Sequence, residues 1–309
     1  METLTVNGQL FALSKLHVGG NDKTGIWATI AKDDYMMEDG SVERIPIVPG
    51  SGIRGKLRRL LLDDFIDQVG YTIKTPKLFY LKSGGALEEV SASDSGRLDL
   101  GMRRSIRMYL HPLSLFGGSM GNQAFAGKLE IFDGQLICKE LYEAGYLAVP
   151  SKIKFSRFIG KTFMTRHAER ELPVEVAANM RTGKKGSANA EPTIQMKVDL
   201  EVLIRGSRFT HKFKLLDTSP LEKSCFARMI ELWRDRPNVG GKSAVGFGEL
   251  RLDYPDMPWS SMEYLRWVSE HKADVVQALE KLDTVSKIPE KPQKQKQLAD
   301  VTPKDDGDK

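Results

Sequence analysis

The sequence predicts an α+β fold in which helices pack on one sheet, and three observations support this. Of the 309 residues, 40% are apolar and 28% are charged, which suffices for a sizeable core. Apolar residues alternate with mostly polar ones from Ile194 to Ile204, as in a half-buried strand, whereas they recur at helical spacing between Ile53 and Phe65. Although the length allows two domains, one elaborated domain of this size is common.

The expected elements follow one another as strand, helix, strand, strand, helix, strand, which is the ferredoxin-like order with long insertions. Residues 205–208 look like a hairpin turn into a strand at 209–215. Ser219 and Pro220 form a good N-cap and first position for the helix that follows them. The expected strands cover residues 4–18, 128–138, 194–204 and 249–254, and the expected helices cover residues 53–65, 220–236 and 261–282.

The first of these helices has an unusual start. Ser51 or Gly52 is expected to be its N-cap. Arg54, Lys56 and Arg58 then fall in the first two turns, where the helix macrodipole disfavours cations. This pattern indicates that an anion from outside the protein offsets the unfavourable interaction between these cations and the helix dipole.

The segments outside these elements are interpreted as insertions and a tail. Residues 72–101 are irregular, with a Gly84-Gly85 pair and a serine-rich stretch, and are expected to be an insertion. Residues 286–309 have almost nothing to bury. We therefore expect a single domain over residues 1–285 and a disordered basic and polar tail after it.

The composition predicts a cytoplasmic protein with no membrane partner. The sequence has no run of 18 apolar residues, as a membrane span requires, and its start lacks the basic and apolar regions of a signal peptide. The two cysteines, Cys138 and Cys225, are far apart. This excludes a disulfide framework and a zinc ribbon, and it suits a reducing compartment.

Positive charge is concentrated in one segment. The net charge of the whole chain is +5. Residues 151–190 alone contain nine basic and three acidic residues, a balance of 9 − 3 = +6. Shorter basic stretches lie at 54–59 and 103–107. Concentrated charge of this kind is typical of a protein with a polyanionic partner.

Residues 238–248 are rich in glycine without forming a nucleotide-binding loop. A phosphate loop requires a glycine where Arg236 stands, and it requires a strand before it and a helix after it, whereas the expected order is the reverse. The backbone N–H groups around Lys242 could contact a phosphate backbone. Equally, the glycines could serve only a connection that needs positive φ angles. The sequence leaves both interpretations open.

The sequence predicts no metal site and no cofactor. The five histidines make no metal-ligand spacing with one another or with the cysteines. Asp33 and Asp34 are placed in a polar loop after the first strand, where they could act as acid and base or hold a metal. Adjacent acids in a loop are usually just solvated, so catalysis there is the lesser expectation.

Three segments occur in a fixed order between residues 4 and 254. They are residues 47–58 (IVPGSGIRGKLR), residues 115–117 (LFG) followed by 127–129 (GKL), and residues 240–248 (GGKSAVGFG). In sequence and order they resemble the I-P-G-S-S-hydrophobic-K-G-hydrophobic-R segment, the L-F-G…G-x-L segment and the glycine-rich G-G-x-x-x-x-G-x-G loop of the RAMP superfamily. These are the repeat-associated proteins of CRISPR effector complexes.

This resemblance implies a palm of RRM-like fold, a projecting thumb β-hairpin at about 158–192, fingers at about 70–112, and polymerisation along CRISPR RNA (crRNA). The thumb segment also holds Phe163 and Met164, which are expected to act as wedges that displace a base beside basic residues. The alternative is a flexible basic loop. The residues implied in RNA binding are Ser51, Gly52, Arg54, Lys56, Arg58, Lys161, Arg166, Arg170, Gly240, Gly241, Lys242 and Ser243.

A single copy of each motif is similar to the repeated backbone subunit of type III and type IV complexes. The sequence lacks the E-x-V-P-x-G-like end of a type III thumb before Ile194, and residues 32–36 match the type III cleavage loop poorly. We therefore favour a non-catalytic type IV backbone subunit that forms a helical filament of copies on crRNA, with other effector subunits and a DNA target. A type III subunit that cuts target RNA with a metal at Asp33 or Asp34 is the alternative, and a generic single-stranded RNA-binding protein is a third.

Overall fold

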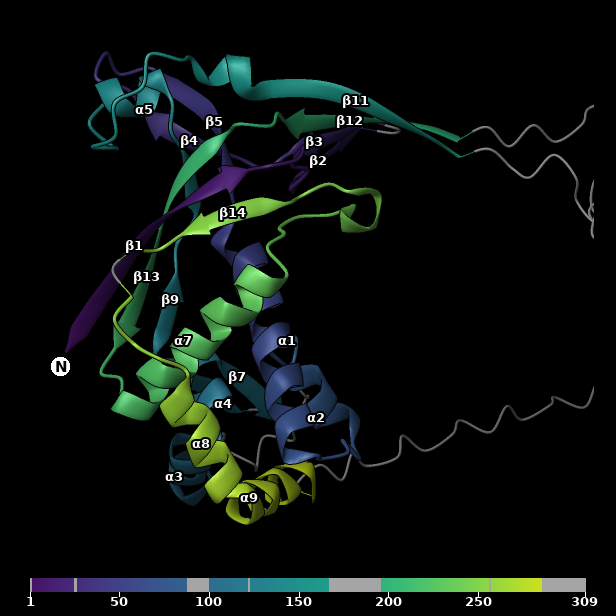
Figure 1. Cartoon of the computed structure of the whole chain (residues 1–309). Coiled ribbons are helices and arrows are strands. Elements are labelled where there is room, and N and C mark those ends of the chain that lie inside the picture. Colours follow the sequence, from purple (N-terminus) through teal and green to yellow (C-terminus); the bar gives the residue numbers. More distant parts are fainter. Residues whose placement is uncertain are drawn as a thin grey trace, which may run out of the picture.

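The largest sheet of the protein, which we call the palm sheet, has seven strands and runs down one side of the molecule (Figure 1). The computed structural model describes residues 2–24, 27–87, 100–121, 123–166, 196–255 and 257–284. All pairs of neighbouring strands in this sheet are antiparallel. Their order is β14 (Leu250–Asp253), β1 (Thr3–Ala12), β13 (Arg208–Leu216), β10 (Gly134–Leu136), β5 (Val42–Val48) and β4 (Lys32–Met36), and β9 (Leu129–Ile131) also pairs with β13.

The core of this sheet confirms the predicted α+β fold. In chain order the core elements are β1, helix α1 (Gly50–Val69), β9 with β10, β13, helix α7 (Pro220–Asp235) and β14. In space the fourth core strand lies beside the first, then come the third and the second. This is the ferredoxin-like arrangement, with the β4–β5 hairpin added at one edge. The second core strand, expected as one segment over 128–138, is divided into two by Phe132 and Asp133.

The strand expected at 194–204 lies in a different sheet from the one predicted. β12 (Met196–Leu203) pairs with β11 (Ile159–Arg166) and β3 (Trp27–Ile30), whereas β13 pairs with β1, β9 and β10. The prediction of a hairpin at 205–208 is therefore wrong, because that turn passes from one sheet to another. Together with β2 (Gly19–Thr24), these strands form what we call the projecting sheet, in the order β11-β12-β3-β2.

One carboxylate holds the base of the projecting sheet. Glu201 of β12 accepts hydrogen bonds from the backbone N–H of Ile30 at 3.1 Å and from Lys32 Nζ at 2.9 Å. Its carbonyl oxygen lies 2.8 Å from Nδ1 of His17, in the segment that leads out of β1. That segment begins at residue 13, so β1 ends earlier than the predicted Val18.

Helices cover one face of the palm sheet (Figure 1). The predicted helical spacing is confirmed in α1, where Ile53, Leu57, Leu61 and Phe65 are all buried. In α7, Ser219 and Glu222 form a reciprocal capping box. The other helices are α2 (Pro76–Leu81), α3 (Leu100–Tyr109), α4 (His111–Phe116), α5 (Lys139–Glu143), α8 (Met262–Glu270) and α9 (Lys272–Thr284), with 3₁₀ turns at Phe155–Phe158 and Ser243–Val245.

The helix expected over 261–282 is two helices. The chain leaves α8 at His271, whose Nδ1 lies 3.0 Å from the carbonyl oxygen of Trp267 and whose ring stacks on that indole at 4.6 Å. The change of direction lets α9 bury Val275 and Leu279 in the core that it shares with α1 and α3. Hydrophobic spacing alone could not show this break, because both helices present apolar residues to the same core.

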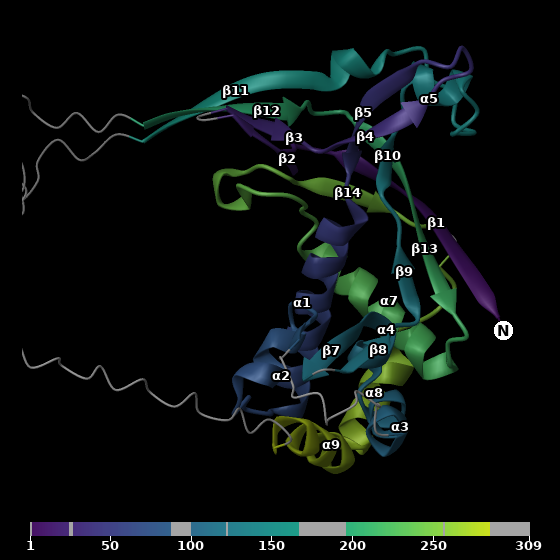
Figure 2. The ribbon, with the colours of Figure 1, turned by 180° about the vertical axis from the view of Figure 1, so that it is seen from behind.

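The insertion expected at 72–101 contains regular structure. α2 lies in it, together with β6 (Gly85–Leu87), which pairs with β7 (Gly117–Gly121); β7 in turn pairs with β8 (Gln123–Ala126) to complete a small sheet near α4 (Figure 2). The expected tail at 286–309 lies outside the described residues, and the domain limits stay predictions. Among the described helices, none combines the length and the apolar character that crossing a membrane requires.

Two buried histidines mark the core behind the palm sheet. His211 of β13 lies on the helix-covered face, and its Nδ1 is 2.8 Å from the hydroxyl of Tyr254. Gly8 makes room for this pair, because a Cβ there would lie 2.1 Å from the Tyr254 ring. His111 of α4 packs edge-on against Trp267 at 4.5 Å. Burial lowers the pKa of both histidines from the usual 6.5 to about 4.

Candidate functional site

The first residue of α1 is closely packed, whereas the next two residues are exposed. The helix begins at Gly50 with Pro49 as its N-cap, so the predicted N-cap at Ser51 or Gly52 is wrong and both residues lie in the first turn. Gly50 donates its backbone N–H to Asp133 Oδ1 at 2.6 Å, and a Cβ on Gly50 would lie 2.6 Å from the carbonyl oxygen of Ile131. Ser51 and Gly52 are exposed, and no atom lies within 4 Å of where a Gly52 Cβ would be.

Arg54 and Arg58 bind carbonyl oxygens of the protein itself. Arg54 donates to the carbonyl oxygens of Leu129, at 2.7 Å, and Phe116. Arg58 donates to the same Phe116 oxygen at 3.0 Å, and each guanidinium lies 5.5 Å from the centroid of the Phe116 ring. Burial lowers the pKa of Arg54, and burial together with the charge of Arg54 lowers that of Arg58 to about 10. These two cations join the 47–58 segment to the LFG and GKL segments.

Lys56 joins the same helix to the glycine-rich segment. Its ammonium donates to the carbonyl oxygens of Arg236, at 2.5 Å, and Asn238, at 2.6 Å, and to the side-chain oxygen of Asn238. Burial, with a smaller effect of the Arg236 charge, lowers the pKa of Lys56 to about 8. A cavity of about 500 Å³ lies beside it, lined by residues that include Leu60, Ser243 and Phe247.

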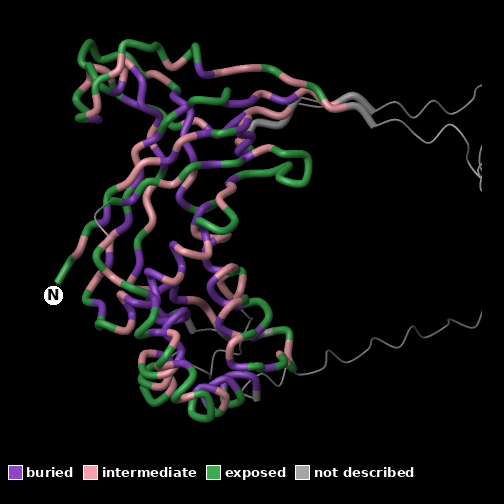
Figure 3. The backbone as a smooth tube through the Cα atoms, in the orientation of Figure 1, coloured by how far each residue is buried: buried purple, intermediate pink, exposed green. Residues whose placement is uncertain are grey.

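The glycine-rich loop, residues 240–248, has a packed base and an exposed tip. At the base, Gly240 and Gly248 have φ angles of +75° and +88°, and a Cβ on them would lie 2.5 Å and 2.2 Å from backbone oxygens of His17 and Val239. The glycines therefore do serve the backbone, as one of the two interpretations held. The tip, from Lys242 to Gly246, is exposed (Figure 3). Lys242 itself has a φ of +66°, which L-residues adopt infrequently.

On the projecting sheet, the two expected wedge residues point to opposite faces. Phe163 and Met164 are neighbours on β11, where successive side chains alternate between the faces of the sheet. Phe163 is 63% exposed and shares its face with Lys161, which is also exposed. Met164 is half-buried and shares its face with Thr162, whose hydroxyl oxygen accepts a hydrogen bond from Lys15. Of the two, Phe163 is the side chain that is open to a ligand.

Arg166 and Arg170 are the expected RNA-binding residues about which the structure says least. The backbone of Arg166 ends β11 opposite Met196. Its side chain and the whole of Arg170 lie outside the described residues. The same holds for most of the segment expected to form the thumb, of which β11 and β12 are the described flanks.

Asp33 and Asp34 lie on a strand, not in the loop that was predicted. Both belong to β4, at the edge of the palm sheet, and therefore point to opposite faces. Asp33 lines a cavity of about 570 Å³ with Tyr35 and Gln135, whereas Asp34 pairs with Arg44 at 3.2 Å. In the part of the chain that the structure describes, no three His, Cys, Asp or Glu side chains gather as metal ligands would.

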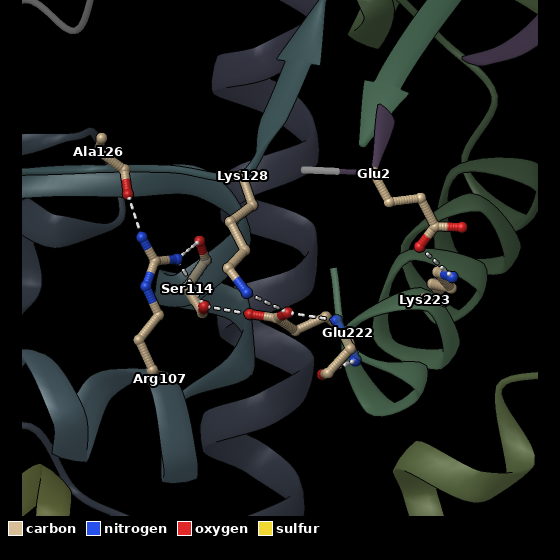
Figure 4. A network of polar contacts seen from close by, with 8 residues as sticks. Glu2, Arg107, Ser114, Ala126, Lys128, Glu222 and Lys223 are labelled. Atoms are coloured by element: carbon tan, nitrogen blue, oxygen red, sulfur yellow. Dashed lines mark hydrogen bonds and ion pairs between the residues drawn. The ribbon is translucent and has the colours of Figure 1, made fainter. Parts of the chain in front are cut away.

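A buried carboxylate that sequence reasoning missed ties Ser114, just before the LFG segment, and the GKL segment to α7 (Figure 4). Glu222 accepts hydrogen bonds from the hydroxyl of Ser114, from Lys128 Nζ at 2.7 Å and from the backbone N–H of Ser219 at 2.8 Å. Burial alone would raise its pKa, but these donors outweigh burial and lower it. Arg107 extends the network to the carbonyl oxygens of Ser114 and Ala126, both at 2.7 Å. The Ser219-x-x-Glu222 spacing predicts the capping box at the start of α7, but it does not predict that Ser114 and Lys128 also bind Glu222.

The glycine-rich loop and the projecting sheet, which carry several of the exposed candidates, extend to the same side of the molecule (Figure 1). α1 lies between the loop and α2 (Figures 1 and 2). Ser51, Gly52, Lys161, Lys242 and Ser243 are exposed. Arg54, Lys56 and Arg58 hold this frame together from within. The arrangement can offer backbone N–H groups, a hydroxyl and ammonium groups to an extended anionic ligand.

The comparisons with known proteins agree with the motif order. The family model described as the RAMP superfamily matches residues 10–251. A solved structure named "Type IV-B CRISPR Complex" is similar to the chain with a TM-score of 0.57 and 16% sequence identity, and the alignment covers 81% of this chain and 89% of that one. At this identity the likeness shows the fold alone. No curated protein matches the chain.

Proposed function

This chain belongs to the RAMP superfamily, and from that premise we propose that it is a crRNA-binding backbone subunit of a CRISPR effector complex, of the type IV kind. In this proposal, copies of the chain assemble as a filament on the guide RNA in the cytoplasm, together with other effector subunits, and present the guide to a DNA target. The similarity to a chain of a type IV-B complex supports the type IV choice.

One observation supports the proposal: hydrogen bonds join the first family motif to the segment that leads into the glycine-rich loop. Lys56 of the first motif is bonded to Asn238 at the entrance of the glycine-rich loop, which brings the exposed residues of both motifs to the same part of the molecule. A backbone subunit must accept any guide sequence, so its contacts should be to sugar and phosphate. We assign these contacts to Ser51, Gly52, Gly240, Gly241, Lys242 and Ser243, with Lys161 on the projecting sheet.

We do not assign RNA contacts to three of the expected RNA-binding residues, Arg54, Lys56 and Arg58. Their polar atoms already donate to carbonyl oxygens of Phe116, Leu129 and Asn238. Moving them to a phosphate would leave those oxygens without these donors, which costs free energy when a group is buried. Their proposed role is to hold the frame on which the exposed residues sit.

The proposed subunit does not cut RNA. Because Asp33 and Asp34 point to opposite faces of β4, a metal ion could take only one of the two carboxylates, and among the described residues neither of them belongs to a group of three potential metal ligands. A complementary RNA incubated with the guide-loaded protein and a divalent cation should stay intact. Cleavage that Asp33→Asn with Asp34→Asn abolishes would replace this proposal with the type III alternative.

The mass of complexes on RNAs of graded length tests the backbone role. The protein alone should associate weakly, and each fixed increment of RNA length should recruit one more copy. A single copy on every RNA, whatever its length, would reject the filament and leave only a generic RNA-binding protein. RNAs of equal length and different sequence should recruit the same number of copies.

A further inference from the structure

Helix α2 presents two aromatic rings to solvent. Phe79 is 57% exposed and Tyr80 is 47% exposed, whereas Leu78 and Leu81 of the same helix are buried in the core. The rings meet edge to face at 6.3 Å. Core packing therefore explains the inward side of this short helix, whereas about half of the surface of each outward ring is not covered by the described residues.

A cation fixes one of these rings in place. Lys82 Nζ lies 5.7 Å from the centroid of the Phe79 ring and 2.5 Å from Asp63 Oδ1 of α1. The ion pair holds the ammonium against the ring, and the ring keeps its exposed surface. A fixed aromatic ring loses little conformational freedom when a ligand packs on it.

The exposed side of α1 connects this ring to the start of the helix. Gly52, Gly55, Arg59 and Asp63 follow one another at spacings of three, four and four residues, which places them along one side of a helix. No atom lies within 4 Å of where a Cβ on Gly52 or Gly55 would be, and Arg59 is exposed. At 1.5 Å per residue, the path from Gly52 to Asp63 is about 16 Å long.

We propose that Phe79 is a stacking platform for an unpaired base of the nucleic acid whose backbone passes along α1. This inference rests on the proposed function and names a contact that lies outside the family motifs. The base covers the exposed face of Phe79, Lys82 steadies the ring, and Arg59 lies along the route of the phosphates. Tyr80, at the edge of the same patch, borders the platform.

The surroundings favour a nucleic acid over a protein as the occupant. Base–aromatic stacking tolerates any base because every base has a π-face, which suits a protein that must accept any guide. Arg59 is exposed on α1, one helical turn before the Asp63 that pairs with Lys82, and its charge complements a polyanion on that side of the helix. α2 also lies on the side of the molecule to which the glycine-rich loop and the projecting sheet extend (Figures 1 and 2).

Binding of Phe79→Ala to two single-stranded RNAs of equal length tests the proposal, one RNA with normal bases and one with abasic sites throughout. Loss of stacking should weaken binding of the normal RNA about tenfold, and binding of the abasic RNA by less than twofold. The salt dependence should not change, because no charge is removed. Phe79→Trp should restore the affinity for normal RNA. Met262→Ala is the matched control, since Met262 is a 73% exposed apolar side chain on α8.

Equal weakening on both RNAs, or no weakening on either, would overturn the platform. If Phe79→Ala binds both RNAs normally and instead loses a co-purifying effector subunit, the patch is a protein-docking surface and the proposal is wrong. If the wild-type protein binds neither RNA, the proposed function itself fails. The two failures are therefore distinguishable.

Discussion

Two regions of the molecule carry basic side chains that point in different directions. Those of the first family motif, in the palm, point into the protein, whereas those described in the glycine-rich loop and the projecting sheet are exposed. Arg58 is only 8% exposed and donates to a backbone oxygen of Phe116. Lys161 and Lys242 belong to the same set of expected RNA-binding residues, yet both side chains are exposed. A basic residue inside a family motif therefore does not by itself mark the ligand surface. The direction of its side chain decides whether it holds the frame or faces the ligand.

If this division is correct, changes at the inward-facing basic residues Arg54, Lys56 and Arg58 should alter the free energy of unfolding and leave RNA binding by the folded protein unchanged. Changes in the loop and the projecting sheet should do the opposite.

The largest expected effect is the pH dependence of palm stability. The pKa of His111 and of His211 is about 4 in the folded state, so as the pH falls the unfolded chain takes up these protons first, near 6.5. Their contribution to stability is complete above pH 6.5 and is lost as the pH falls toward 4. Urea unfolding at graded pH should show a loss of roughly 5 kcal/mol between pH 7.5 and 4.5.

This window separates the histidines from the carboxylates. Glu222, whose pKa is lowered from 4.5, loses its contribution only below that pH. Replacing one histidine, as in His211→Phe, should reduce the slope between pH 6.5 and 4.5 by about half. A stability curve that is flat over this interval in the wild-type protein would contradict the buried, neutral state of both rings.

Glu222→Ala should have the next largest effect. The change leaves Lys128 and Ser114 without their partner at a site where the Glu222 side chain is 2% exposed. We expect a loss of about 4 kcal/mol in the free energy of unfolding, measured by urea denaturation at pH 7. Glu270→Ala removes an exposed carboxylate paired with Arg266, and it should lower the free energy of unfolding far less than Glu222→Ala does, because water screens a surface ion pair. Equal costs for the two substitutions would show that the network in Figure 4 does not stabilise the fold.

Arg58→Met should destabilise the palm by about 2 kcal/mol and leave the salt dependence of RNA affinity unchanged. The substitution keeps the apolar stem and removes the guanidinium that donates to Phe116. Its neighbour on the helix, Arg59, is exposed, and Arg59→Ala should change stability by less than about 0.5 kcal/mol. A flatter salt dependence for Arg58→Met, measured on the folded protein, would mean that Arg58 turns outward to bind phosphate.

The smallest effect on stability, and the clearest one on binding, is expected for Lys161→Gln and Lys242→Gln. Each should lower the slope of log affinity against log salt by about 0.7 on single-stranded RNA. The free energy of unfolding should stay within about 0.5 kcal/mol of the wild-type value. An unchanged slope in the double variant would mean that neither residue contacts RNA. The proposed difference between the palm and the two exposed regions would then be wrong.

Local signals in the sequence predicted most of the elements. Ser219 and Pro220 correctly located the start of α7, and the spacing from Ile53 to Phe65 located α1, because caps and amphipathic spacing act within one element. The signal at 205–208 correctly predicts a turn, but the prediction that this turn joins two paired strands is wrong. A turn signal fixes where the chain reverses, but it carries no information on which distant strand will pair with the next segment.

The candidate site was predictable as a set of segments but not as a surface. The motif order identified three segments that the structure brings together through Lys56, Arg54 and Phe116. It could not show that Arg54 and Arg58 point inward, or that Phe163 rather than Met164 is the exposed one of the two on β11, because each outcome depends on one residue of helical or strand register. Phe79 has no motif around it, and only its exposure on a packed helix distinguishes it.

The order of strands in the palm sheet also determines how long β1 lacks its partners while the chain is being synthesised. Of the seven palm strands, β1 is synthesised before the others, yet it lies between β13 and β14, and Ala12 pairs with Leu250, 250 − 12 = 238 residues later. At 5 to 20 residues per second, a nascent chain needs about 12 to 50 s to make that span. The edge of β1 that pairs with β13 stays open until residues 208–216 have been made, and the edge that pairs with β14 stays open until residues 250–253 have been made. We expect the growing chain to depend on chaperones until β14 emerges, and any chain that stops before residue 250 to keep an open edge on its first strand.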